Sequence, residues 1–155
     1  MGPEVLEQHK QLQMGIGEWA GTISMYQPEM KEPEVAPCSE VVTAIGELWT
    51  TSRFEMDFMG SKFVGSGTLG YDSLKKKYVG TWIDSMNPTI TAMEGEFDEA
   101  KQAMVMHYDM YDPMTKSMTP MRNEMVHKGD SYSLSFFKKG DADEALYMKI
   151  DMKRK

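Results

Sequence analysis

The chain has 155 residues, with 17 Lys and Arg against 24 Asp and Glu, and its formal net charge is −7. Such an acidic balance disfavours a broad surface that follows nucleic-acid phosphates, so we expect no nucleic-acid partner. Cys38 is the single cysteine, which excludes an internal disulfide and a zinc cluster built on several thiolates.

The first predicted element is a helix over residues 3–14, where apolar residues recur at three-to-four spacing. Gly17 ends this region, and the apolar period then changes to two, which is typical of a half-buried strand. A proline-rich stretch follows and predicts a loop over residues 27–38, because proline donates no hydrogen bond to a strand ladder. We interpret this long loop as a candidate portal.

The rest of the chain is predicted to be strand. The expected strands cover 39–48, 49–58, 62–72, 77–84, 89–98, 103–111, 120–128, 131–138 and 145–153. The expected turns are Met59-Gly60-Ser61, Asp72-Ser73, Asn87-Pro88, Asp112-Pro113, Lys128-Gly129-Asp130 and Gly140-Asp141. Ten closely spaced strands without helices between them favour an all-β, antiparallel up-and-down barrel, since closure removes the two exposed sheet edges. We expect one domain over residues 1–155.

Several motifs resemble a known family. The segments that carry the resemblance are Gly17–Gly21, Gly46–Trp49, Gly67–Asp72, Lys77–Ser85, Glu94–Asp98 and Met148–Arg154. The first contains G-x-W after a short helix and resembles the opening of calycin-type barrels. Together the segments resemble a bacterial family of unknown function, the one numbered 1579. The resemblance implies a lipocalin-like or fatty-acid-binding-protein-like barrel and implies no activity; Arg154 is expected to stack on Trp19 and close the barrel.

Methionine is the outlier of the composition, with 17 of 155 residues. Methionine is flexible and polarizable and is over-used on adaptable binding surfaces. Alternation places rows of methionine and aromatic residues, with Leu146 and Ile150 beside them, inside the barrel. We therefore predict an interior that binds a small apolar or amphipathic molecule without catalysis. The predicted ligand-binding residues are Trp82, Met93, Met104, Met106, Tyr108, Asn123, Met125, Tyr132, Leu134, Phe136 and Met148.

Other functions are weighed against this one. The second hypothesis is an interaction or assembly module with a filled core, which leaves a homo-oligomer open. A copper site at Met104-x-Met106-His107 is disfavoured because His107 points away from both thioethers. Haem binding has one candidate ligand, His127, which shares a face with Met125. We expect no metal and no cofactor.

Catalysis finds little support in the sequence. Alternation turns Phe54, Met56 and Phe58 inward and sends the charged residues between them to solvent, so no inward-facing ionisable pair is expected. The match to G-x-G-x-x-G over 65–70 is followed by another strand rather than a helix, so it predicts a bent strand and not a phosphate loop. Without a leader pattern or a long apolar run, we expect a cytoplasmic protein with no membrane insertion.

Overall fold

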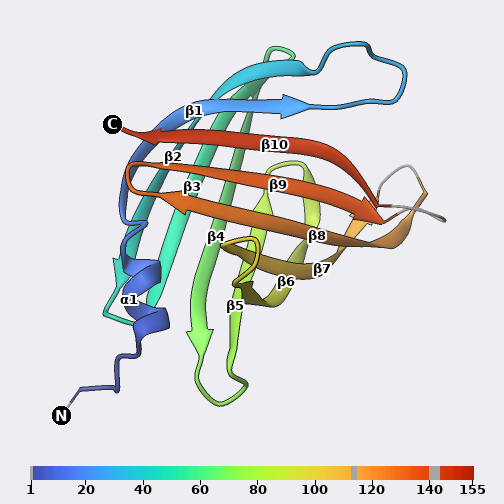
Figure 1. Cartoon of the computed structure of the whole chain (residues 1–155). Coiled ribbons are helices and arrows are strands. Elements are labelled where there is room, and N and C mark those ends of the chain that lie inside the picture. The colour runs from blue at the N-terminus through green and yellow to red at the C-terminus, as the bar shows by residue number, and fades with distance from the viewer. Residues whose placement is uncertain (1, 113–114, 140–143) are drawn as a thin grey trace.

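A closed antiparallel barrel forms the body of the protein. The computed structural model describes residues 2–112, 115–139 and 144–155, and within these it has ten strands and one helix (Figure 1). The elements are α1 (Glu7–Gln13), β1 (Gly17–Met25), β2 (Glu34–Ile45), β3 (Trp49–Phe58), β4 (Ser61–Asp72), β5 (Lys77–Asp84), β6 (Asn87–Asp98), β7 (Ala103–Asp112), β8 (Ser117–Lys128), β9 (Ser131–Lys139) and β10 (Glu144–Arg154). The predicted fold class is confirmed. No helix in the described segments has the length and apolar character needed to cross a membrane.

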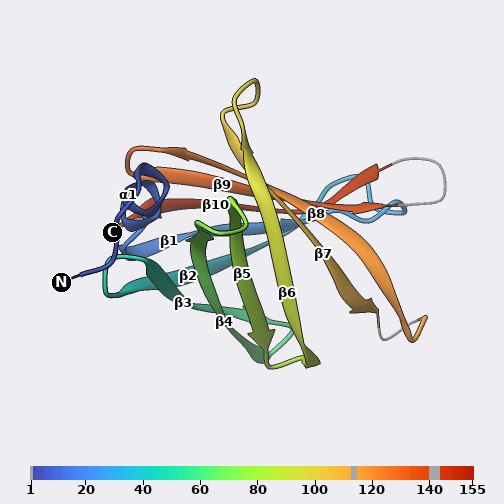
Figure 2. The same cartoon turned by 90° about the horizontal axis from the view of Figure 1, so that it is seen from below.

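Each strand pairs with its neighbours in the chain, and β1 pairs with β10 to close the wall. In Figure 1, β1, β10, β9 and β8 run side by side across the front, while β2 to β5 run behind them at a steep angle. Figure 2 views the same strands from below, with α1 beside one end of the barrel. The hairpin loop between β1 and β2 lies at the opposite end.

The helix is fixed to the barrel by a buried histidine. The Nδ1 atom of His9 accepts a hydrogen bond from the backbone N–H of Leu6 at 2.9 Å. The Nε2 atom therefore carries the proton and donates it to the carbonyl of Tyr71 on β4, at 3.0 Å. Leu6 has extended backbone angles, so the helix begins at Glu7 and is shorter than the predicted 3–14.

The seam between β1 and β10 is covered by Arg154. Its guanidinium lies 4.3 Å from the ring centroid of Trp19, which confirms the expected stacking. The same side chain donates to the carbonyls of Met14 and Ile16, just after α1, and to Asp130. One arginine thus joins the end of the helix to the last strand.

Several predicted boundaries differ from the structure: β2 ends at Ile45 rather than at residue 48, and β8 begins at Ser117 rather than at residue 120. The pairing accounts for two further differences. The loop expected over 27–38 ends early, because β2 begins at Glu34 and includes Pro37. Residues 34–37 pair with β1 alone, and the β3 side begins at Cys38, so Pro37 lies where one side of β2 has no ladder. Asn87 and Pro88 belong to β6, and the turn consists of Ser85 and Met86.

Some expected positions fall outside the described part of the chain. The turn expected at Asp112-Pro113 includes Pro113, and the one at Gly140-Asp141 lies there entirely. The side chain of Phe58, which was expected to point inward, is also outside it.

Candidate functional site

The interior of the barrel gathers the predicted ligand-binding residues into continuous rows. Across the pairing registers, Met104 lies opposite Met125, which lies opposite Leu134. In the next row Met106, Asn123 and Phe136 are neighbours, and Phe136 in turn lies opposite Met148. The alternation therefore places these side chains on one face of the wall, as predicted.

The eleven predicted residues differ in burial. Five are buried and keep less than a tenth of their surface exposed: Met104, Met106, Tyr108, Asn123 and Tyr132. Six are half-buried although they pack on the core: Trp82, Met93, Met125, Leu134, Phe136 and Met148. Inward-facing side chains in a close-packed core are normally fully buried, so the second group marks the part of the interior that solvent reaches.

A bulge in β10 changes which of its residues face inward. The register shifts between Leu146 and Met148, which leaves Tyr147 as the extra residue. Tyr147 packs against Phe136, with 6.2 Å between the ring centroids. Leu146, expected inside, lies opposite Phe137 and is 38% exposed. The expectation for Leu146 is therefore wrong, and Tyr147 takes its place.

The bulge completes a polar group near the end of the barrel away from α1. The Tyr108 hydroxyl lies close to the polar side chains of Tyr147 and Asn123. Burial raises the pKa of Tyr108 to about 12 and also raises that of Tyr147. Both phenols therefore stay protonated at neutral pH. Tyr108, Asn123 and Tyr147 form one polar cluster in an otherwise apolar wall.

A second polar group, which the sequence analysis missed, centres on Glu40. The carboxylate oxygen Oε1 of Glu40 accepts a hydrogen bond from the hydroxyl of Tyr132 at 2.8 Å. Burial raises the pKa of Glu40, and the bond from Tyr132 offsets only part of that shift. Glu40 is thus an inward-facing ionisable group that the alternation count did not identify; the expectation concerned an ionisable pair. Glu40 alternates in step with Cys38 and Val42, but this signal is weak because Val41 occupies the other face of the strand.

Cys38 lies on the same face of β2 as Glu40. Its Sγ is 3.9 Å from the Sδ of Met152, and burial together with the charge of Glu40 raises its thiol pKa to about 12. A thiol with so high a pKa is protonated at neutral pH and is a poor nucleophile. Cys38 therefore contributes packing to this region.

The glycines of the G-x-G-x-x-G match make room for two tryptophans. A Cβ at Gly65 would lie 2.1 Å from the Trp82 ring, and one at Gly70 would lie 2.2 Å from the ring of Trp49. These glycines have ordinary backbone angles, so their role is close approach of an indole, which differs from the sharp bend we expected. Trp82 donates from Nε1 to Asp84 at 2.9 Å.

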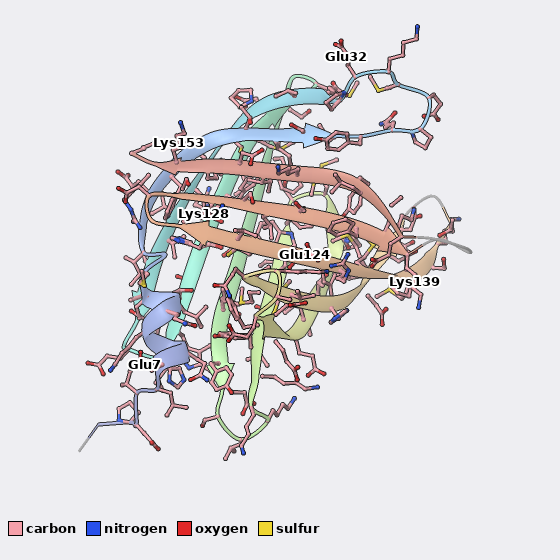
Figure 3. The ribbon with its side chains drawn as sticks, in the orientation of Figure 1. Glu7, Glu32, Glu124, Lys128, Lys139 and Lys153 are labelled. Atoms are coloured by element: carbon pink, nitrogen blue, oxygen red, sulfur yellow. The ribbon has the colours of Figure 1, made fainter. Side chains whose placement is uncertain are left out.

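The outer wall carries most of the charge. Glu55 lies between Arg53 at 3.1 Å and Lys62 at 3.3 Å, and these hydrogen bonds lower its pKa. His107 is exposed, on the opposite face of β7 from Met104 and Met106, as predicted. Lys128 and Lys153, labelled in Figure 3, are also exposed. The charged face expected for β3 is confirmed.

His127, the candidate haem ligand, lies near the Arg154 seam. Its ring stacks on Tyr132, with 6.1 Å between centroids, and meets the edge of Trp19 at 5.5 Å. Burial and the charge of Arg154 lower its pKa. His127 is exposed, so it lies at the rim of the interior rather than within it.

Two hollows lie on the outside of the wall. One, of about 620 Å³, is lined by Glu94, His107, Arg122 and Glu144, among others. Arg122 binds both carboxylate oxygens of Glu144 at 2.8 Å and also pairs with Glu124. The other, of about 670 Å³, lies over β1, β8, β9 and β10. In the first hollow the opposite charges of Arg122 and Glu144 already neutralise each other.

Comparison with solved structures shows which proteins share this architecture. The chain is similar to the crystal structure of Rv2717c from M. tuberculosis, with a TM-score of 0.72, 13% identity, and coverage of 98% of this chain and 99% of that one. It is also similar to the S-type phycobiliprotein lyase CPES from Guillardia theta, with a TM-score of 0.62, 13% identity, and coverage of 94% and 91%. At such identities the likeness shows the fold alone.

Sequence comparison gives the family. No curated protein matches the chain. The family match covers residues 4–154 and therefore includes every strand of the barrel and the helix. This chain belongs to the family described as "Protein of unknown function (DUF1579)".

Proposed function

We propose that the barrel binds a small apolar or amphipathic molecule in its interior, without catalysis. The observation that carries this proposal is the partial exposure of six inward-facing residues, Trp82 and Leu134 among them. Side chains that face inward and yet keep accessible surface are what a hollow interior requires. A core packed along its whole length would leave them less accessible surface.

The chemistry of the wall supports the same proposal. Methionine, leucine and aromatic side chains supply apolar surface, and burial of ligand surface against them is worth about 25 cal/mol per Å². Methionine adapts its shape to varied ligands. Tyr108 and Asn123 supply hydrogen-bonding groups that orient a polar end. The similar barrel of CPES belongs to a protein named as a phycobiliprotein lyase, so this fold is also found in a protein that acts on another molecule.

We place the portal at the end away from α1. There the hairpin loop between β1 and β2 spans residues 26–33, and loops of this kind are often functional. The helix covers the other end through His9 and Arg154. A ligand therefore enters beside the Tyr108 cluster.

The test fills the interior and measures binding. A neutral fluorescent probe, N-phenyl-1-naphthylamine, is titrated into wild type and into Leu134→Trp, which adds bulk inside. We expect the variant to lose at least about tenfold in affinity, equivalent to about 1.4 kcal/mol. Ser135→Trp, on the opposite face of the same strand, is the control and keeps wild-type affinity.

Two results contradict the proposal. One is a wild type that does not bind the probe. The other is a folded Leu134→Trp, verified by circular dichroism, that binds as tightly as wild type. Loss of binding in Ser135→Trp alone would move the site to the outer wall.

A further inference from the structure

We propose that Glu40 is the anchor for a cationic nitrogen, so that the barrel prefers amphipathic ligands with an ammonium group. This inference rests on the proposed function, because it requires a ligand in the interior. The chemical class of that ligand would be an amphipathic molecule with an ammonium group. An alkylammonium ion would place its charge at Glu40 and its chain along the methionine and aromatic rows.

The surroundings of Glu40 are apolar on both neighbouring strands. In the pairing registers Glu40 lies opposite Trp19 on β1 and opposite Phe54 on β3. These two side chains are only 1% and 4% exposed. Tyr132, which reaches across the interior from β9 to donate its proton, is 7% exposed. A carboxylate held in such a place has lost much of its hydration.

No cation among the described residues forms an ion pair that would compensate for this loss. Among the ion pairs of the described residues, none includes Glu40. Arg154, which lies over Trp19, pairs with Asp130 and donates to the carbonyls of Met14 and Ile16. Glu40 is therefore an inward carboxylate whose charge the described part of the chain leaves unpaired.

One oxygen of Glu40 remains available to a ligand. Tyr132 occupies Oε1, and Oε2 has no hydrogen bond from the described protein. No fully buried side-chain oxygen in those residues lacks a partner, so Oε2 keeps accessible surface. An oxygen of this kind, among buried apolar side chains, is the acceptor that an ammonium group would use.

The physical reason for the preference is the cost of an unpaired buried charge. An isolated carboxylate in an apolar site becomes neutral unless a cation or several donors stabilise it. The raised pKa of Glu40 is the sign of that cost. An ammonium ligand would restore a pair and hold the carboxylate ionised, whereas an anionic headgroup would add a repulsion.

The experiment compares three ligands that share one chain. Decylammonium, 1-decanol and decanoate, all below the concentrations at which they form micelles, compete with N-phenyl-1-naphthylamine for the full chain at pH 7.5. We expect decylammonium to compete about tenfold better than decanol, and decanoate to be the weakest. This comparison uses wild type alone, so it does not depend on the folding of a variant.

Two variants then assign the preference to Glu40. Glu40→Gln keeps an acceptor for Tyr132 and removes the charge, so it is expected to weaken decylammonium about tenfold and to leave decanol unchanged. Glu18→Gln makes the same change in net charge at an exposed position of β1 and is expected to change neither. This control distinguishes a local ion pair between Glu40 and the ammonium group from a general attraction of the cation to an acidic protein.

The outcomes also separate the anchor from the function it rests on. If the probe binds and decylammonium competes no better than decanol, the anchor is wrong and the binding function stands. If decylammonium is preferred and Glu18→Gln reduces that preference as much as Glu40→Gln does, the anchor is also wrong. If the probe does not bind wild type at all, both proposals fail.

Discussion

A carboxyl group inside an apolar barrel has to be neutral, or paired with a donor or a cation, and Glu40 has one donor, Tyr132, at 2.8 Å. The ionised form is the one that burial penalises, which is why the pKa of Glu40 is raised. Cys38 and Tyr132 face the same region, and burial raises the pKa of both. Both therefore stay protonated at neutral pH, and Glu40 is the member of this group that changes its charge.

The stability of Glu40→Gln is predicted to depend on pH. At about pH 4 and below, wild-type Glu40 is largely protonated in the folded and the unfolded chain, so its burial does not lower the stability through a buried charge. Between the ordinary pKa of the unfolded chain and the raised folded-state pKa, the unfolded chain ionises while the folded carboxyl stays protonated, so the folded chain loses stability as the pH rises. We expect Glu40→Gln to melt above wild type at neutral pH, with a difference that shrinks towards pH 4.

Thermal melts at a series of pH values measure this difference. For a chain of this size, 1 kcal/mol moves the Tm by about 2–4 °C. Glu18→Gln, on the exposed side of β1, serves as the control and should follow wild type at every pH. If the difference in Tm between Glu40→Gln and wild type stayed constant, or shrank as the pH rises, burial of the ionised carboxyl would not be destabilising and the prediction would be wrong.

At the scale of the elements, the wall closes where β1 meets β10, and Gly21 lies at that seam opposite Met152. A Cβ at Gly21 would lie 1.8 Å from the carbonyl oxygen of Asp151 and 2.9 Å from the Cα of Met152. These are backbone atoms, so they do not rotate away as the end of a side chain would. The close approach of the two strands therefore requires glycine at this position.

Gly21→Ala is predicted to lower the stability of the protein by about 1–3 kcal/mol, the cost of overpacking a well-packed region. Equilibrium unfolding in urea measures the change. The control is Ala20→Ser, a small substitution at the neighbouring position of the same strand. Equal stability of Gly21→Ala and wild type would mean that the seam between β1 and β10 is looser than the pairing indicates.

The strands show how far the sequence alone could lead. The alternation of apolar residues correctly predicted which side chains of β7, β8 and β9 face inward, because a regular strand turns every second side chain to the same face. The bulge at Tyr147 broke that rule on β10 and exchanged Leu146 for Tyr147. Glu40 was missed because β2 has valines on both faces, Val41 and Val42, so its apolar pattern does not identify the inner face.

At the scale of the whole molecule, the up-and-down strand order decides at which end of the barrel each turn lies. The described turn residues that follow odd-numbered strands lie at the end away from α1, because the strands alternate in direction. Four exposed methionines lie in or beside those turns: Met30, Met59, Met86 and Met118. They surround the end where we place the portal, and a flexible apolar rim suits the passage of an apolar ligand.

Mild oxidation with hydrogen peroxide tests this distribution, because methionine oxidation follows exposure. The four rim residues are 45%, 85%, 72% and 55% exposed in chain order, whereas Met106 and Met152 are 1% and 2% exposed. We expect the rim residues to form sulfoxides on the order of tenfold faster, as measured by mass spectrometry of proteolytic peptides. Met106 on β7 and Met152 on β10 are almost fully buried. If they were oxidised as fast as the rim residues, peroxide would have to reach the deepest part of the barrel. Protection of the rim residues themselves would mean that this end is covered, and the portal would then have to lie elsewhere.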